Sequence, residues 1–408
     1  MENKIKIVDS IMGSGKTSWA IQYMNEADGN QKFIYITPFL SEVQRIKSAV
    51  KNHVFYEPVN KGKGKLDSLK KLILNEKNIV STHALFQTAD DEMMELIRAS
   101  NYTLILDEVM SVVEEYPLNN DDFKLLIDNE MIYIDKHDGT VHWNDESKYQ
   151  DTKYDELKMV CKTENLIYFE NTILFWTFPV EVFKSFKQVY VLTYLFEAQE
   201  QRYYYDMHQL NYSYKAVART VDGVYTLVNH EEKDPYNKEQ IKSLINIYEG
   251  NLNSIGDNPN SLSLSWYGKN ALLLKKMKKN ISTYFKNNTR TSSQLNMWTC
   301  YKVYRGELKD KGYSGTSKRP CFVAHNARAT NDYQHKQALA YVISRFMKPH
   351  KYKFFRSKGI EVNQDLWALS ELLQWIWRSR IRTGKPVNLY IPSKRMRTIL
   401  KDYLDSDK

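Results

Sequence analysis

A short apolar run followed by a glycine-bearing loop is the feature that most restricts how this chain can fold. The run covers residues 5–8, and the loop ends in Gly15-Lys16-Thr17 before a helix-like segment that starts at Ser18. Glycine lets the backbone approach a phosphate closely, and the first helical turn adds unpaired N–H groups and the positive end of its dipole. The order of strand, loop and helix therefore predicts a site for a nucleoside triphosphate.

The loop also indicates which residues contact the nucleotide. Lys16 is expected to reach the β- and γ-phosphates, and the Thr17 hydroxyl to ligate Mg²⁺. Ser10 stands where the first glycine of the usual G-x-x-x-x-G-K-T pattern would be. A flexible loop with a chance Gly-Lys-Thr is disfavoured by the strand before it and the helix after it. The predicted nucleotide-binding residues are Gly13, Ser14, Gly15, Lys16, Thr17 and Ser18.

Length and charge narrow the class of protein. With 408 residues the chain is long enough for two domains. A net charge of +9 and a pI near 9.0 favour a polyanionic partner such as nucleic acid. Three scattered cysteines suit neither a disulfide framework nor a zinc site. Because no apolar run approaches a membrane span and the first predicted strand begins at residue 5, we expect no signal peptide, no membrane segment and a cytoplasmic protein.

The pattern along the chain predicts two α/β domains. The first half alternates short apolar strands with helix-like segments, as in a parallel sheet covered on both faces. We place domain one at 1–205, a boundary segment at 206–238 and domain two at 239–408. Asp138-Gly139 predicts a hairpin near 131–143. The predicted strands are 5–8, 33–37, 78–82, 103–106, 172–177, 189–193, 261–266, 295–299, 321–324 and 387–391.

Helices are predicted in both halves, and one tyrosine-rich segment has two interpretations. In the second half the predicted helices are 240–248, 269–284, 335–346, 365–380 and 393–404. Tyrosines at 203–205, 212 and 214 suit a half-buried strand, although aromatic rings also stack on bases.

Asp107-Glu108 is the second strong signal. An apolar strand, 103–106, ends in these two acids, so they should lie at the carboxyl edge of the sheet, where the loop 10–17 also lies. We expect Asp107 to hold Mg²⁺ and Glu108 to orient and deprotonate the attacking water. Two solvated acids at an ordinary strand end are the alternative, and the nearby phosphate-binding loop argues against it.

Two neighbouring strand ends carry hydroxyl groups. Thr37-Pro38 follows strand 33–37, and Thr82-His83 follows strand 78–82. These residues could present hydroxyls and N–H groups to a phosphodiester backbone. A threonine before a helix is equally a common N-cap, and the residues alone leave both interpretations open.

Gln374, Arg378 and Arg382 repeat every four residues near the end of the chain. If the helix 365–380 continues that far, the three side chains share one face. Two guanidiniums and an amide suit the charge that develops on a γ-phosphate. A solvated basic face beside a tryptophan-rich core is the alternative.

In this order, the motifs resemble those of superfamily 2 helicases. Motif I corresponds to 10–17, and Thr37-Pro38 and 81–83 resemble motifs Ia and Ib. Asp107-Glu108-Val109-Met110 takes the place of DEAD/DEAH, and Thr177-Phe178-Pro179 looks like a modified motif III. The segment 326–331 stands where motif V belongs, and 374–382 resembles motif VI. The wording Trp-Arg-Ser-x-Ile-Arg at 377–382 is most similar to members encoded by bacteriophages and prophages.

The resemblance implies a fold and an activity. It implies two RecA-like domains, each a mainly parallel sheet flanked by helices, with ATP and Mg²⁺ in the cleft between them. It also implies that Arg378 and Arg382 act as arginine fingers, with Arg380 as a rival, and that Arg328 and Thr330 contact nucleic acid. The space before the loop leaves no room for the adenine-reading motif of DEAD-box RNA helicases, which favours DNA over RNA.

We therefore expect an ATP-hydrolysing DNA helicase or translocase of phage replication or recombination, in the cytoplasm of a bacterial host. Replication or recombination proteins are its possible partners. Two alternatives remain open: a phage packaging-type ATPase, and a nucleotide-gated adaptor that binds nucleic acid without unwinding it.

Overall fold

The computed structural model describes residues 4–60, 64–144, 152–232, 238–316, 319–326 and 332–406. The chain forms two compact units that interleave along the sequence. The first consists of Met1–Asp9, Gly15–Glu231 and His350–Val362, and the second of Ser10–Ser14, Glu232–Pro349 and Asn363–Lys408. Both contain mainly parallel sheets flanked by helices, which confirms the predicted α/β class.

The main sheet of the first unit has eight strands in the order β13-β12-β1-β11-β5-β2-β4-β3. Every pairing is parallel except that of β12 with β13. The central strands are buried apolar runs, the composition expected of strands covered on both faces. The bounds are β1 (Ile5–Asp9), β2 (Phe33–Thr37), β3 (Phe55–Tyr56), β4 (Asn78–Thr82), β5 (Thr103–Asp107), β11 (Gln188–Thr193), β12 (Tyr212–Arg219) and β13 (Tyr225–Asn229).

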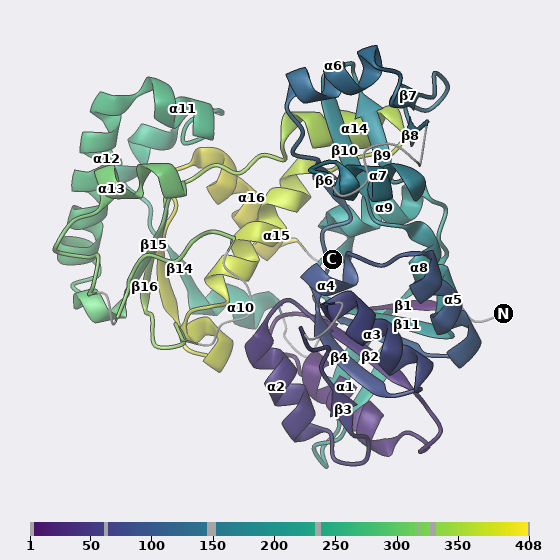
Figure 1. Cartoon of the computed structure of the whole chain (residues 1–408). Coiled ribbons are helices and arrows are strands. Elements are labelled where there is room, and N and C mark those ends of the chain that lie inside the picture. The colour runs from purple at the N-terminus through teal and green to yellow at the C-terminus, as the bar shows by residue number, and fades with distance from the viewer. Residues whose placement is uncertain are drawn as a thin grey trace. The chain divides into compact units, whose positions relative to one another are not determined.

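Amphipathic helices cover this sheet (Figure 1). Trp19 and Tyr23 of α1 stack 5.4 Å apart, and both rings meet the ring of Tyr190 on β11 edge-on. Val43 and Ile46 of α2 belong to the same buried core. The bounds are α1 (Lys16–Glu26), α2 (Leu40–Ala49), α3 (Lys65–Leu74), α4 (His83–Phe86), α5 (Asp91–Ser100), α8 (Val180–Ser185) and α9 (Glu200–Met207).

A smaller antiparallel sheet, in the order β6-β10-β9, belongs to the same unit. β10 (Ile173–Thr177) lies at its centre between β6 (Val113–Glu115) and β9 (Leu166–Phe169). The prediction that 172–177 joins the parallel sheet is therefore wrong, and Thr177 does not lie at its carboxyl edge. A short apolar run fits a buried strand of either direction, so its periodicity could not decide the partner.

The predicted hairpin near 131–143 is confirmed. β7 (Ile132–Ile134) pairs antiparallel with β8 (Val141–Trp143). Its turn packs on the smaller sheet, because the N–H of Tyr168 on β9 donates to the carbonyl of Gly139 at 2.8 Å. Two helices flank this region, α6 (Asn120–Asp128) and α7 (Asp155–Lys162).

One helix of the first unit comes from late in the chain. Figure 1 shows α14 (Pro349–Ser357), in yellow-green, beside β9 and β10. The ring of Phe354 lies 5.6 Å from that of Phe169 and 4.8 Å from that of Phe175. Lys351 of the same helix pairs with Glu200 of α9 at 2.7 Å. The chain thus leaves the second unit to complete the core of the first.

The second unit contains a four-stranded parallel sheet in the order β14-β17-β16-β15. Figure 1 shows α12 and α13 on one side of this sheet and α15 and α16 on the other. The strands are β14 (Ile245–Ile247), β15 (Asn296–Thr299), β16 (Ala338–Tyr341) and β17 (Val387–Tyr390). The helices are α10 (Lys238–Leu244), α11 (Leu264–Lys269), α12 (Ala271–Thr283), α13 (Arg305–Leu308), α15 (Gln364–Ile376) and α16 (Lys394–Asp405).

Several predicted elements of the second half are wrong in type. The predicted strand 261–266 contains the start of α11, where the Ser263 hydroxyl accepts the N–H of Trp266 as an N-cap. The predicted helix 335–346 contains β16, which is buried between β15 and β17. The segment 321–324 makes only an isolated bridge, at Phe322, and 240–248 is part helix and part strand. These short apolar runs suit either element until their burial is known.

The tyrosine-rich segment is also not a single strand. Tyr203, Tyr204 and Tyr205 lie on α9 and are fully buried, whereas Tyr212 and Tyr214 lie on β12. Stacking of α9 tyrosines on bases is thereby excluded, because their rings are enclosed by the protein. The segment 206–238, predicted as a boundary, contains β12 and β13, which extend the main sheet of the first unit.

No helix in the described part of the chain is long and apolar enough to cross a membrane. The three cysteines, Cys161, Cys300 and Cys321, are free and buried. Burial raises the pKa of the Cys161 thiol to about 12, so this thiol is protonated at neutral pH.

The packing of α14 gives a prediction about stability. Phe354→Ala removes a fully buried ring and should lower the free energy of unfolding of the first unit by about 3–5 kcal/mol. Arg356→Ala on the same helix is the matched control, because Arg356 is exposed, and should cost less than about 1 kcal/mol. Denaturant unfolding of both variants measures the difference. Equal losses would show that α14 does not stabilise the unit through this ring.

Candidate nucleotide site

The loop between β1 and α1 requires glycine at two positions. Gly13 and Gly15 have φ values of 91° and 99°, in the left-handed region that other residues avoid. Gly15 is also crowded, because a Cβ there would lie 2.1 Å from Cε1 of Tyr225 on β13. The N–H of Tyr225 donates to the Gln22 side chain of α1 at 2.9 Å, which fixes β13 against this helix. The close approach of Tyr225 was not predicted from the sequence.

The sheet order brings the loop to the Asp-Glu strand. β11 lies between β1 and β5, with Asp9 opposite Thr193 and Leu192 opposite Asp107 in its two registers. The carboxyl ends of the three strands are therefore level to within one residue. The Thr17 hydroxyl lies 3.5 Å from Oδ1 of Asp107. A hydroxyl and a carboxylate at this separation are oxygen ligands suited to one Mg²⁺ ion.

The electrostatics of Asp107 fit a site for a cation. Asp107 as a whole is half-buried, but its carboxyl group is enclosed by the protein. Burial of this group, and after it the charge of Glu108, raise the pKa of Asp107 to about 7. A divalent cation would oppose this shift because it stabilises the ionised form. Burial and the charge of Asp107 raise the pKa of the nearby Tyr35 hydroxyl well above its usual value, so the hydroxyl remains protonated.

The backbone after Asp107 is held in an uncommon conformation. Glu108 has a φ of 71°, which is strained for a residue with a side chain. Its N–H donates to the carbonyl of Leu192 at 2.9 Å, and the N–H of Met110 donates to the buried Gln201 side chain at 2.9 Å. Gln201 in turn donates to the Tyr205 hydroxyl at 2.8 Å. The buried α9 therefore fixes the turn that carries the two acids.

A third carboxylate, Asp9, shapes the same edge of the sheet. It accepts the N–H groups of Leu195 and Phe196, both at 2.9 Å, and so ties the segment after β11 to the end of β1. Burial raises the pKa of Asp9, while these two donors oppose that shift. Thr193 ends β11 between the loop and Asp107, with its buried hydroxyl lacking a hydrogen-bond partner among the described residues. The strand 189–193 was predicted, but Asp9 and Thr193 were not identified as site residues.

The loop contains groups that suit phosphate. Lys16 and Thr17 are the first two residues of α1, and Gly15 is its N-cap. The Ser14 hydroxyl is buried and has no hydrogen-bond partner among the described residues. An unpaired buried hydroxyl is costly, and a phosphate oxygen would satisfy it. The donor groups of the loop therefore fit the phosphates of a nucleotide. The enclosed carboxyl of Asp107, whose pKa is raised, likewise fits Mg²⁺.

Thr37 and Thr82 lie at the carboxyl ends of β2 and β4, on the same edge of the sheet. Neither acts as a side-chain cap: α2 has Phe39 at its N-cap, and Thr82 precedes α4 without a side-chain cap bond. The N-cap interpretation is therefore wrong for Thr37, whereas Thr82 stands at the N-cap position of α4 without a capping hydrogen bond from its side chain. Pro38 and His83 follow them directly.

The geometry predicted for the arginine segment is wrong. α15 ends at Ile376, so Gln374 is helical, Arg378 follows the end, and Arg382 lies in the short 3-10 helix Arg380–Thr383. The three do not share one helical face. The helical path ends here because the Ser379 hydroxyl donates to the carbonyl of Ile376 at 2.6 Å and the backbone of Ser379 is extended.

The arginines differ in their surroundings. Arg378 is buried, Arg382 is half-buried, and the Arg380 guanidinium donates to the carbonyl of Pro386. Arg328 and Thr330 lie outside the described residues.

The main sheet of the first unit carries a glycine-bearing loop and an Asp-Glu strand end, and the chain also contains a second parallel α/β unit. The solved structure named XPD_APO has a similar fold: its TM-score is 0.53 at 14% identity, and the match covers 98% of this chain and 96% of that chain.

The chain belongs to the YonV family. It is 45% identical over 416 residues to the SPbeta prophage-derived uncharacterized protein YonV of Bacillus subtilis (strain 168), covering 99% of this chain and 100% of the relative. Residues 113–176 match the YonV middle domain, and residues 239–404 match the YonV C-terminal Rossmann-like domain. The middle domain corresponds to the smaller antiparallel sheet, the hairpin and the helices α6 and α7.

The contact between Gly15 and Tyr225 can be tested by a double-mutant cycle. Gly15→Ala should destabilise the first unit by more than about 2 kcal/mol, through left-handed strain and the clash with the ring. In a Tyr225→Ala background only the strain remains, so the same change should cost about 1–2 kcal/mol. Denaturant unfolding of the four proteins measures the coupling. Strict additivity would contradict the contact.

Proposed function

We propose that this protein is an ATP-dependent nucleic-acid motor, a helicase or translocase that acts on DNA. The observation that carries the proposal is the 3.5 Å approach of the Thr17 hydroxyl to Asp107 at the carboxyl edge of a parallel sheet. In P-loop ATPases these two groups hold the Mg²⁺ of the nucleotide. The helicase fold and the basic charge of the chain support a nucleic-acid substrate.

In this proposal each group of the site has one task. The N–H groups of Gly13, Ser14 and Gly15, with Ser18, bind phosphate oxygens. When bound, ATP with Mg²⁺ supplies the phosphoanhydride bond that is cleaved. Lys16 neutralises phosphate charge, Thr17 and Asp107 hold the metal, and Glu108 orients and deprotonates the attacking water.

The nucleic-acid contacts are proposed on the remaining strand ends. Thr37-Pro38 and Thr82-His83 would bind the phosphodiester backbone, since the two threonine hydroxyls are not used as helix caps. In the second unit we assign Arg328 and Thr330 to the same task. We propose a role in phage replication or recombination, with proteins of those processes as partners, because the relative YonV is prophage-derived.

The central test compares hydrolysis and binding in two variants. Glu108→Gln keeps the size of the side chain but loses the proton acceptor, so ATP should still bind while hydrolysis falls by about two to four orders of magnitude. Lys16→Ala should lose both binding and hydrolysis, because the phosphate charge is no longer neutralised. Steady-state hydrolysis and equilibrium nucleotide binding measure the two effects. Glu115→Gln, which changes an exposed residue of β6, is the matched control and should hydrolyse ATP normally.

The same assay tests the substrate. Wild-type hydrolysis should be stimulated by single-stranded or forked DNA more than by RNA, and a forked DNA should be unwound. Hydrolysis without any unwinding or translocation would favour the alternative function, a nucleotide-gated adaptor that binds nucleic acid without unwinding it. Normal turnover in folded Lys16→Ala protein would contradict the nucleotide site itself.

The arginine segment gives a separate prediction. We propose that Arg382, with Arg378 and Gln374, stabilises the charge that develops on the γ-phosphate. Arg382→Ala should then slow single-turnover hydrolysis by about 10³-fold or more with a smaller loss of nucleotide affinity. Arg382→Lys should not restore the rate, since an ammonium lacks the planar fork. Arg380→Ala should be milder in hydrolysis, because Arg380 bonds a carbonyl of its own unit; a larger defect at Arg380 would reverse the assignment.

A further inference from the structure

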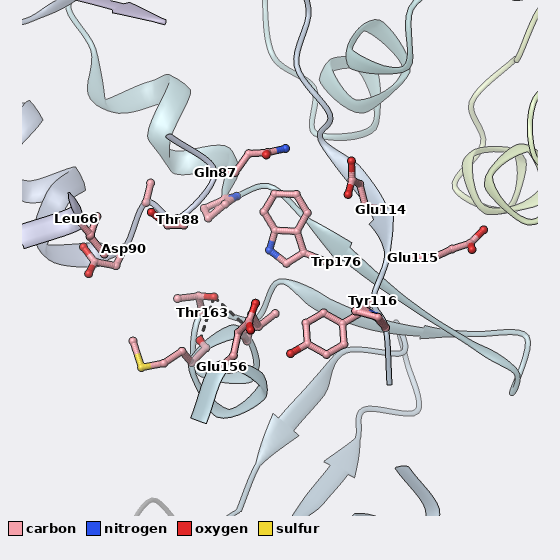
Figure 2. A pocket seen from close by; sticks show the side chains of 15 residues that line it. Leu66, Gln87, Thr88, Asp90, Glu114, Glu115, Tyr116, Glu156, Thr163 and Trp176 are labelled. Carbon is pink, nitrogen blue, oxygen red and sulfur yellow. Dashed lines mark hydrogen bonds between the residues drawn. The ribbon is translucent and has the colours of Figure 1, made fainter. Parts of the chain in front are cut away.

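A cavity of about 450 Å³ lies where the middle domain meets the helical layer of the first unit. One wall comes from residues 87–90, which follow α4, and the other from β6, α7 and β10. Figure 2 shows the Trp176 indole in the middle of this pocket, with Glu114 and Glu156 on opposite sides of it in this view. The volume lies within the range of sites that bind small groups, about 300–1,000 Å³.

The lining combines aromatic, apolar and acidic side chains. Trp176, Tyr116 and Met159 supply the aromatic and apolar surface, and the lining residues that the structure describes include no lysine, arginine or histidine. Burial and the charge of Glu156 raise the pKa of the Tyr116 hydroxyl to about 12, so Tyr116 is neutral at physiological pH.

The acids of the pocket are not equivalent. The Asp90 carboxylate is occupied within the protein, because it pairs with Lys70 at 2.6 Å and accepts the N–H of Met93 as the N-cap of α5. Glu114 and Glu156 are exposed. Glu115 also borders the pocket, but its carboxylate points away from Trp176 in Figure 2. Two carboxylates beside an aromatic face therefore remain for a ligand.

This chemistry selects a planar cation. A phosphate group would be repelled by the carboxylates, so a nucleotide or a nucleic-acid strand fits poorly. A guanidinium stacks on an indole and pairs with carboxylates through its fork of N–H donors. Its aliphatic stem would pack on Met159 and the ring of Tyr116.

We propose that this pocket is a docking site for an arginine side chain of a partner protein. The charge complementarity is local, since the chain as a whole carries a net charge of +9 and would otherwise repel a basic segment. Most of the lining comes from the middle domain, within 113–176, and the rest comes from other segments of the first unit. A docked arginine would thus contact both parts at once.

The test uses a fluorescein-labelled peptide in which three arginines are separated by Gly-Ser pairs. Its binding to the full chain is measured by fluorescence anisotropy, against the same peptide with citrulline, which is isosteric with arginine but neutral. The arginine peptide should bind at least about tenfold more tightly than the citrulline peptide. Trp176→Ala, and the double variant Glu114→Gln with Glu156→Gln, should each weaken arginine-peptide binding by about tenfold or more. Glu115→Gln is the matched control and should bind normally.

Other outcomes would overturn the proposal. Equal binding of the two peptides, or no binding of either, would exclude a guanidinium site. Spermidine that binds in place of the arginine peptide would indicate a free polyamine rather than a protein partner. Competition by single-stranded DNA that requires Trp176 would indicate a base pocket. Nucleotide hydrolysis of each variant is measured in parallel, so that a failure of the docking proposal is distinguishable from a failure of the proposed motor function. The double glutamine variant keeps the side-chain volumes, so it still tests the pocket if Trp176→Ala does not fold.

Discussion

The parallel pairing of β1 with β11, and of β11 with β5, is the interaction on which the site depends. Parallel strands end at one edge of a sheet, so this order places the loop after β1 and the two acids at the end of β5 on either side of the end of β11. The register leaves Thr17 and Asp107 within 3.5 Å, although 90 residues separate them in the chain. The Gly-Lys-Thr and Asp-Glu sequences come together only because β11 pairs with both β1 and β5.

The same edge concentrates unfavourable electrostatics and strain. Burial raises the pKa of both Asp9 and Asp107; two backbone N–H groups oppose that shift at Asp9, whereas the charge of Glu108 adds to it at Asp107. Glu108 adds a left-handed backbone, and the network from Gln201 holds the turn in place. A bound cation would offset the electrostatic cost at Asp107, as the proposed metal–nucleotide site requires.

The middle domain is built by chain segments from distant parts of the sequence. The small antiparallel sheet lies between the Asp-Glu strand and β11 in chain order, and α14 completes its core with Phe354. This region also supplies most of the acidic and aromatic pocket around Trp176. The first unit thus carries the carboxyl edge of its main sheet, with Thr17 and Asp107, and a separate acidic pocket at its middle domain.

The sequence by itself determined those residues of the candidate site whose chemistry is local. Gly13 and Gly15, Lys16-Thr17 and Asp107-Glu108 are recognisable because each needs a particular residue type at a fixed distance from a strand end. The α/β class followed from the alternation of strands and helices for the same reason, since hydrophobic periodicity is a property of neighbouring residues.

The tertiary structure decided what depends on distant contacts. Burial between β15 and β17 makes 338–341 a strand rather than a helix, and antiparallel partners take 173–177 out of the main sheet. The early end of α15 separates Gln374 from Arg382. Asp9 and Gln201 acquire their roles only from backbone groups far along the chain. Such pairings leave no local periodicity, because the free energy that selects them comes from packing between segments and not from the segments themselves.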